Sequence, residues 1–354
     1  MSRKALLLFA AASVIWGSSF LFIRVAVEHL PPSAVVFGRT VLGAAFLVPL
    51  AVRSRAFRGM RRVIVPVAVV TVLDMAAPTF LTAWGEQHIS SSAAGILTAT
   101  DPLFTAVLAL WLIRSEAPGR KQFAGLVIGF AGVIALLGID FRGSLVELAA
   151  AGAVLLSALG YAGAALVYRR WLADVPAIGV TALMTAISSL AFLAPAAVNL
   201  PREVPPASSI FALVTLGIIN TGLAYWLFYL LIDQAGAATA SVITYVMPVV
   251  ALVLGVALLG EPLTVGAIAG LPLIGLGAWL ATSRHPTRYG TGADVQDGRS
   301  TGLANKTGRG GETAGSLSKE SGVGPHGTPQ PGQRLPGRFR HTWPEVSHEN
   351  DRRY

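Results

Sequence analysis

The sequence predicts an all-α polytopic membrane protein, with ten transmembrane helices arranged as two five-helix repeats of inverted topology and a disordered C-terminal tail. Three observations predict this fold class. Of the 354 residues, 53% are apolar and only 13% are charged, whereas soluble domains carry roughly 25% charged residues. Long apolar segments fill residues 1–283. Two parts of the chain also resemble each other at a separation of about 145 residues.

Five membrane-spanning helices are predicted in the first half of the chain. Crossing ~30 Å of hydrocarbon takes about 20 helical residues. Lipid-exposed backbone must satisfy its own hydrogen bonds, and apolar runs without inside/outside alternation favour helices over barrel strands. The first and fifth segments carry no charge, whereas the second, third and fourth carry Arg39, Asp74 and Asp101. The predicted helices cover residues 5–23, 31–52, 63–84, 89–113 and 122–139.

Five more helices are predicted in the second half, and none of them contains a charged residue. They cover residues 148–168, 175–200, 207–232, 235–260 and 262–283. The character of the chain then changes. Residues 284–354 hold 13 of the 38 glycines, 6 of the 21 prolines, 11 basic and 7 acidic residues. Such a segment cannot bury enough apolar area to offset its chain entropy, so we expect a disordered cytoplasmic tail.

The basic residues indicate the topology. Ten helices place both termini on one side of the membrane, and the positive-inside rule makes that side the cytoplasm. Outside loops then carry only Arg142 and Arg202. The inside loops carry Arg3, Lys4, Arg53, Arg55, Arg58, Arg61, Arg62, Arg114, Arg120, Lys121, Arg169 and Arg170. This alternation accounts for much of the net charge of +9 without a nucleic-acid-binding surface, so we expect the bilayer of the plasma (inner) membrane as a partner and no nucleic acid.

An internal repeat divides the spans into two halves, 1–143 and 144–283. Residues 94–98, followed by Pro102, align with residues 240–244, followed by Pro248, at an offset of 146. Glu116 then aligns with Glu261 at an offset of 145, as do Gly125 with Gly270 and Gly132 with Gly277. Because five helices form each half, the second half enters the membrane from the opposite side. Two inverted halves can exchange conformations, which is the basis of alternating access.

These residues resemble the drug/metabolite transporter superfamily, and within it the EamA-type ten-helix transporters. The resemblance covers about residues 1–283. It rests on Trp16-Gly17-Ser18-Ser19, Arg39, 94–102, 237–248, Gly260-Glu261-Pro262-Leu263-Thr264 and 270–277. Ser115-Glu116-Ala117-Pro118 and Asp101 depart from the family pattern. The resemblance implies secondary transport, usually export of small metabolites or drugs, through a central cavity, and it does not imply a particular substrate.

Three intramembrane charges are the leading candidates for a site. A charge near the middle of the bilayer costs at least ~2.5–3.5 kcal/mol, so it needs a partner or a cavity. Counted from the outer boundary at ~1.5 Å per residue, Arg39 lies ~12 Å deep and Asp74 and Asp101 both lie ~18 Å deep. The three could therefore meet, either to couple proton entry to transport or to form an ion pair that joins helices. The second half has Thr185, Asn220 and Met247 at the equivalent positions.

Neutral residues supply the remaining candidates. Trp16, Asn220 and Tyr245 are placed at mid-span, where their polar atoms need partners, and are predicted to line the cavity. Pro78, Pro102 and Pro248 interrupt backbone hydrogen bonding and are predicted kinks or hinges. Arg24, near the outer end of the first helix, is expected to reach toward Glu28.

Other function classes find little support in the sequence. The chain has no cysteine, and only two of its six histidines precede the tail, so no metal site and no cofactor are expected. It contains no phosphate-binding loop and no nucleophile elbow. We therefore expect no enzymatic activity, and a secondary transporter that exports a small-molecule substrate, with proton coupling and a homodimer left open. A passive facilitator or uptake permease stays open, as does an intramembrane enzyme that uses Asp74 and Asp101.

Overall fold

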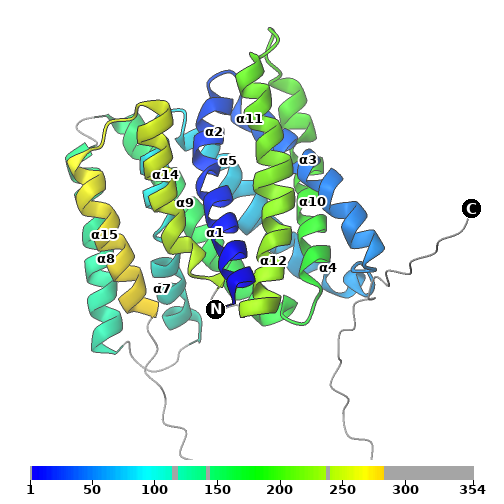
Figure 1. Ribbon diagram of the computed structural model, residues 1–354, viewed down its shortest axis with the longest axis horizontal. Helices are drawn as coiled ribbons and strands as arrows, with labels where there is room; N and C mark the ends of the chain where they lie inside the picture. The colour runs from blue at the N-terminus through cyan, green and yellow to red at the C-terminus, as the bar shows by residue number, and fades with distance from the viewer. Residues whose placement is uncertain (1, 114–118, 141–143, 237–239, 283–354) are drawn as a thin grey trace, which may run out of the picture. The chain divides into compact units, whose positions relative to one another are not determined.

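The computed structural model describes residues 2–113, 119–140, 144–236 and 240–282. The described residues form helices joined by turns, with no strand among them (Figure 1). This confirms the all-helical class. The predicted tail, Glu116 and Arg142 lie outside the described residues.

The first half of the chain contains the helices of the first five predicted spans. They are α1 (Arg3–Gly17), α2 (Ser19–Val27), α3 (Pro32–Arg53), η1 (Met60–Val63), α4 (Ile64–Val70), η2 (Thr71–Ala76), α5 (Ala77–Gly85), α6 (Ser91–Thr98), α7 (Asp101–Ile113) and α8 (Arg120–Asp140). The second half follows the same plan. Its helices are α9 (Leu145–Val167), η3 (Tyr168–Leu172), α10 (Ala177–Val198), α11 (Ala207–Gly217), η4 (Ile218–Leu223), α12 (Ala224–Ala235), α14 (Ile243–Leu259) and α15 (Val265–Thr282).

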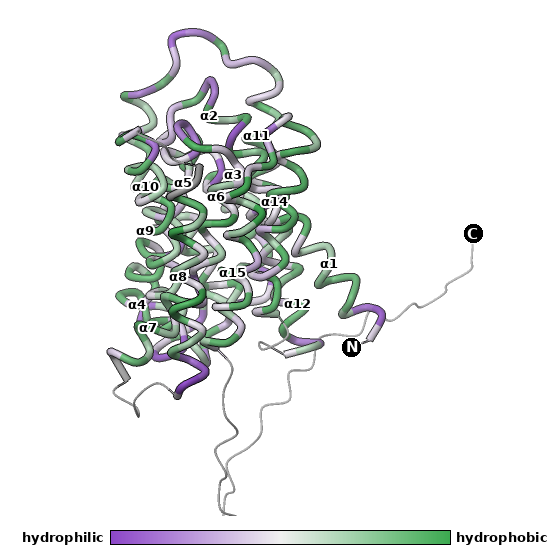
Figure 2. The backbone as a smooth tube through the Cα atoms, turned by 90° about the vertical axis from the view of Figure 1, so that its left-hand side faces the viewer, coloured by the Kyte–Doolittle hydropathy of each residue, from purple (hydrophilic) through white to green (hydrophobic). Residues whose placement is uncertain are grey.

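Within the described ranges, nine helical segments are long and apolar enough to cross a membrane, and α14 is a shorter apolar helix of 17 residues. Figure 2 shows that apolar residues follow the helices, whereas polar residues concentrate at the turns. The polar turns also begin the helices. Ser90 accepts a hydrogen bond from the Ala93 amide at 3.1 Å, and Ser144 accepts one from the Glu147 amide at 3.2 Å. Both serines are N-caps, which satisfy backbone donors that a helix start leaves free.

Regular helical geometry is interrupted in several of the described spans, and one interruption is the π-helical segment η3 at the end of the sixth span. The first span breaks at Ser18, and the fourth breaks at residues 99–100, just before Asp101 and Pro102. The third and eighth spans contain the π-helical segments η2 and η4. These two segments lie about 147 residues apart, close to the offset of the sequence repeat. Because π-helical turns are rare and are frequently found at functional sites, the third and eighth spans are candidates to carry functional residues.

Helices that correspond between the two halves pack against each other in antiparallel pairs. In α8 and α15, Gly125 lies against Gly277, and Gly132 lies against Gly270. In α6 and α14, Gly95 lies against Ala251. The pairs α8 with α15 and α3 with α10 are also neighbours in Figure 1.

The α3 and α10 pair has the same direction of packing. Ser33, near the start of α3, donates to the Pro195 carbonyl near the end of α10 at 3.3 Å. Gly179, near the start of α10, lies against Ala56, just beyond the end of α3. The helices of all three pairs therefore run in opposite directions, and in α8 and α15 the two glycine contacts correspond to each other at the 145-residue offset of the repeat.

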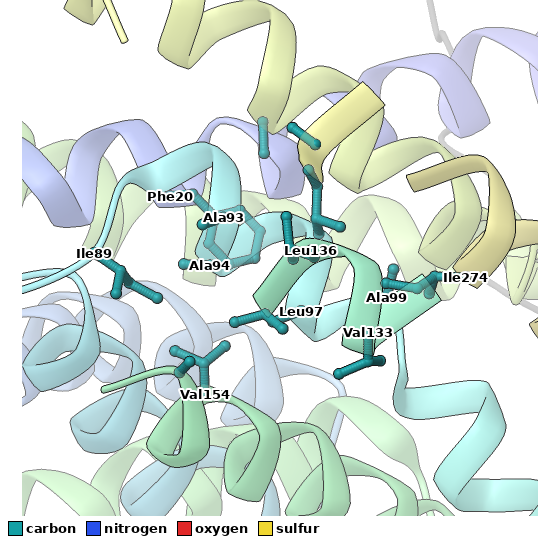
Figure 3. Packing of buried hydrophobic residues seen from close by; sticks show 14 of the residues in the cluster. Phe20, Ile89, Ala93, Ala94, Leu97, Ala99, Val133, Leu136, Val154 and Ile274 are labelled. Carbon is teal, nitrogen blue, oxygen red and sulfur yellow. The ribbon is translucent and has the colours of Figure 1, made fainter. Parts of the chain in front are cut away.

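The largest buried cluster surrounds α6. Figure 3 shows Leu97 of α6 among side chains from α8 and α9, including Leu136 and Val154, with Phe20 of α2 and Ile274 of α15 close by. These residues are at most 5% exposed. Small residues on α6 allow its neighbours to approach closely, as membrane helices generally require. The cluster thus places α6 at the junction of both halves.

Candidate functional site

Arg39 connects the two halves through a single hydrogen bond. Its Nε donates to Thr221 Oγ1 at 2.8 Å, and Thr221 belongs to the π-helical segment η4. The Thr221 hydroxyl itself donates to the Leu216 carbonyl at 2.9 Å. Thr221 is fully buried, whereas Arg39 keeps part of its surface exposed. The guanidinium is therefore held by a neutral hydroxyl and keeps donors for a further partner.

Asp74 lies in another π-helical segment, η2, and also contacts the opposite half. The Tyr225 hydroxyl of α12 donates to Asp74 Oδ2 at 3.2 Å. Asp74 is half-buried, and the charge of Arg39 acts on it. The π-helical segments η2 and η4 thus each carry a polar side chain that contacts a residue of the other half.

Aromatic rings adjoin these two charges. Trp16 of α1 packs edge-on against Tyr225 with ring centroids 5.4 Å apart, and against Phe228 at 4.9 Å. Tyr225 and Tyr229 lie 6.2 Å apart. Tyr161 of α9 lies within electrostatic reach of Arg39, Asp74 and Asp101. We call the group of six residues Trp16, Arg39, Asp74, Tyr161, Thr221 and Tyr225 the central polar cluster.

Asp101 lies beside this cluster at the first residue of α7. Its Oδ1 accepts a hydrogen bond from Thr105 at 3.2 Å, and it is half-buried. The charges of Asp74 and Asp101 act on each other. Arg39, Asp74 and Asp101 are thus brought into one neighbourhood, but each has a neutral hydroxyl as its hydrogen-bond partner.

Asn220 and Tyr245 occupy different surroundings. Asn220 is fully buried, and its amide donates to the Ile15 carbonyl and, at 3.1 Å each, to Ser18 and Ser19. It therefore holds the break between α1 and α2. Tyr245 pairs with the Thr282 hydroxyl at 3.1 Å, near the end of α15. The structure places neither side chain among the hydrogen bonds of the central polar cluster.

The three prolines also differ in their surroundings. Pro78 follows the π-helical segment η2, and its carbonyl accepts a hydrogen bond from Ser157 at 3.1 Å. Pro102 is the second residue of α7, directly after the break in the fourth span. Pro248 lies inside α14 and is buried. Two of the three therefore adjoin an interruption of regular helix.

Arg24 has a different partner from the one expected. It donates to the backbone carbonyl of Glu86, a partner that was not expected, whereas Glu28 is exposed. The pairing with Glu28 stays a prediction. Counting along one helix could not find the contact with Glu86, because the first and third spans are brought together only by packing.

The arrangement suits the binding of a small polar molecule. It offers one positive group, two carboxylates, several hydroxyls and aromatic surface, from helices of both halves. Among the described residues no three histidine, aspartate or glutamate side chains are grouped as metal ligands. The sequence pattern did not select Thr221, because a buried threonine in an apolar span looks like an ordinary packing residue.

Comparison with known proteins assigns the family. The model of the EamA-like transporter family matches residues 3–138 and again residues 148–283. An uncharacterized transporter of Archaeoglobus fulgidus is 24% identical over 289 residues, which cover 80% of this chain and 100% of that one. The uncharacterized inner membrane transporter YedA of Escherichia coli is 27% identical over 271 residues, 74% of this chain and 86% of that one.

A solved crystal structure is similar in fold. It superimposes with a TM-score of 0.58 at 21% sequence identity, over 80% of this chain and 97% of that chain. At this identity the likeness shows the fold alone.

Proposed function

Because the chain belongs to the EamA-like transporter family, we propose that it is a secondary transporter that exports a small metabolite or drug across the plasma membrane by alternating access. It is a multi-pass membrane protein, and the names of its family and relatives point to transport rather than to an enzyme. A small-molecule substrate and the lipid bilayer follow as its partners. The class of substrate, the direction of transport and its coupling to protons are parts of the proposal.

The proposed architecture is ten helices in two inverted repeats. The family model matches each half once, and three pairs of corresponding helices pack antiparallel. We count α14 as the tenth span, since 17 residues at 1.5 Å each reach about 25 Å, the lower end of what crosses a membrane. Inverted repeats allow one architecture to open to either side.

One observation carries the proposal: the central polar cluster is built from both halves. Arg39 and Asp74 belong to the first half, and their partners Thr221 and Tyr225 belong to the second. A movement of one half against the other must change both contacts. A substrate held by these groups would therefore bind the two conformations differently, and such a difference in affinity is what shifts a conformational equilibrium.

Proton coupling is the finer part of the proposal. Asp74 and Asp101 are half-buried, each accepts a hydrogen bond from one hydroxyl, and their charges act on each other. Two carboxylates close together in a low-dielectric setting do not both ionise readily. Binding of a proton by this pair would alter the balance between conformations.

Purified protein in liposomes tests the proposal. Counterflow is screened with amino acids, nucleosides and cationic dyes, with and without an imposed proton gradient. We expect gradient-dependent transport that falls at least tenfold, about 1.4 kcal/mol, in Asp74→Asn or Asp101→Asn. Asp233→Asn, an exposed aspartate at the end of α12, is the matched control. Transport whose rate does not depend on the proton gradient would indicate a passive facilitator. Coupled transport that is intact in both variants would exclude a role for the two aspartates in proton coupling.

A further inference from the structure

A second group of polar residues lies away from the central polar cluster, where the turn after α14 meets the start of α6. The Glu261 carboxylate accepts three hydrogen bonds. Two come from the backbone amides of Ser91 at 2.7 Å and Ser92 at 3.0 Å, and one comes from the Ser92 hydroxyl at 2.5 Å. An anion that accepts hydrogen bonds from the amides in the first turn of a helix is stabilised, because these amides have no partner within the helix and the helix dipole is positive there. We call these three hydrogen bonds the Glu261 latch.

The local backbone places Glu261 in this position. Gly260 ends α14 in a left-handed conformation with φ of +66°, and the Glu261 amide turns back to the Gly255 carbonyl at 3.1 Å. Glycine adopts this left-handed conformation without the steric cost that a side chain would add. Gly255 also lacks a side chain where one would collide with Glu261 Oε2 and the Ser92 hydroxyl. The latch therefore depends on two glycines with different roles.

Glu86 lies beside the latch and has no such partners. The residue is 0% exposed, and in the part of the chain that the structure describes neither carboxylate oxygen has a hydrogen-bond partner. The hydroxyl of nearby Ser91 is likewise buried and unpartnered there. An ionised carboxylate in this position would be costly, because burial removes its hydration and no donor replaces it.

Charged groups from three other elements act on Glu86. Glu261 contributes a like charge from the turn after α14, and Arg24 of α2 and Arg39 of α3 contribute opposite charges. Arg24 donates to the Glu86 backbone carbonyl. His88, two residues along the same turn, is exposed and packs against Trp84.

We propose that Glu86 is a proton-binding site outside the central polar cluster, and that the bound proton keeps the Glu261 latch closed. With Glu86 neutral, Glu261 is the only negative charge in this buried group and stays on the amides of α6. Loss of the proton adds a second negative charge within electrostatic reach of Glu261. Because the amides hold Glu261 only while the turn stays docked, release of the 260–264 turn from α6 relieves the repulsion and lets water reach Glu86.

The direction of the pH effect follows from linkage. Burial raises the pKa of Glu86 well above its usual value, the charge of Glu261 raises it further, and Arg24 and Arg39 act in the opposite sense. In the open form the pKa of Glu86 would return toward its usual value of about 4.3. The latch is therefore fully stable below that value and loses stability as pH rises through the higher pKa of the closed form.

The absence of cysteine from the chain permits a direct test on the full-length protein. Spin labels are placed at Gln87→Cys and Leu263→Cys, both exposed sites on the two sides of the latch. Their separation is measured by pulsed electron resonance in lipid nanodiscs across a pH series. The distance needs no substrate, so the result does not depend on the proposed transport.

We expect one short distance at acidic pH and a growing longer population as pH rises. Glu86→Gln should keep the short distance at every pH. Glu28→Gln changes an exposed glutamate outside the latch and should behave as the parent. Glu261→Ala and Gly255→Ala should show the longer distance even at acidic pH, which keeps the test informative if Glu86→Gln folds poorly. A distance that does not change with pH, or a change that persists in Glu86→Gln, would overturn the proposal.

Discussion

The hydroxyl of Tyr225 donates a hydrogen bond to Asp74 across 3.2 Å, and this contact joins α12 in the second half to the π-helical segment η2 in the first. The ring of Tyr225 also packs edge-on against Trp16. One tyrosine thus links α1, η2 and α12. Its two functions, ring packing and hydrogen bonding, can be separated by substitution.

Tyr225→Phe should keep the ring contact with Trp16 and lose the hydrogen bond to Asp74. We expect a loss of about 1 kcal/mol in the free energy of unfolding, the usual size for such a bond within a membrane protein. Tyr168→Phe is the matched control, because the buried Tyr168 hydroxyl has no partner among the described residues. Unfolding by denaturing detergent in mixed micelles measures both. Equal losses would show that the hydrogen bond contributes nothing.

Arg39→Lys should reduce transport even though it keeps the charge. Lysine has no donor at the position from which Arg39 Nε reaches Thr221, and its ammonium lacks the planar fork of guanidinium. We expect the initial transport rate to fall about tenfold, or about 1.4 kcal/mol. Arg53→Lys at the exposed end of the same helix should leave the rate unchanged. A rate for Arg39→Lys equal to that of the parent would remove this contact from the transport cycle.

Asn220→Ala should destabilise the first span. The amide donates to Ile15, Ser18 and Ser19 where α1 and α2 separate, so its removal takes a donor from these three acceptors, of which Ser19 is buried, at a cost of about 2 kcal/mol. Asn199→Ala offers a control, because its amide bonds only the Pro195 carbonyl at an exposed helix end. Melting temperatures in detergent measure the difference. Similar melting temperatures for the two variants would contradict this account of the break.

Gly277→Ala should weaken the pairing of α8 with α15. A Cβ at Gly277 would collide with the backbone of Gly129 and approach the Gly125 carbonyl, whereas one at Gly275 would meet nothing within 4 Å. Overpacking of this kind typically costs about 1–3 kcal/mol. Gly275→Ala should instead be neutral or stabilising by up to about 1 kcal/mol, because alanine favours a helix. Unfolding in detergent should therefore show Gly277→Ala to be less stable than Gly275→Ala. The reverse order would argue against close packing between α8 and α15.

The topology can be tested with single cysteines in the cysteine-free chain. Arg58 and Gln87 are both exposed and lie in successive turns at the two ends of the third span. With cytoplasmic termini, Gln87→Cys should react with a membrane-impermeant maleimide on intact cells, and Arg58→Cys only after permeabilisation. The opposite pattern would invert the assignment.

Much of the architecture could be predicted because it rests on local properties. Apolar runs such as 31–52 must become helices in lipid, since no other partner satisfies their backbone, and the structure has α3 over Pro32–Arg53. The break at Ser18 was not predicted, whereas the break at residues 99–100 lies directly before Pro102, where a kink or hinge was predicted. The break at Ser18 depends on a side chain from another span, because the Asn220 amide donates to the Ile15 carbonyl there.

By itself the sequence determined the helical class, the approximate spans and the motifs that the two halves share, because the length, spacing and offset of residues can be read along the chain. Only the tertiary structure decided which groups those charges contact. Arg39 bonds Thr221 and Asp74 bonds Tyr225, across 182 and 151 residues of chain. Such pairings depend on the rotation and register of packed helices, and a shift of one residue turns a side chain by about 100° around a helix.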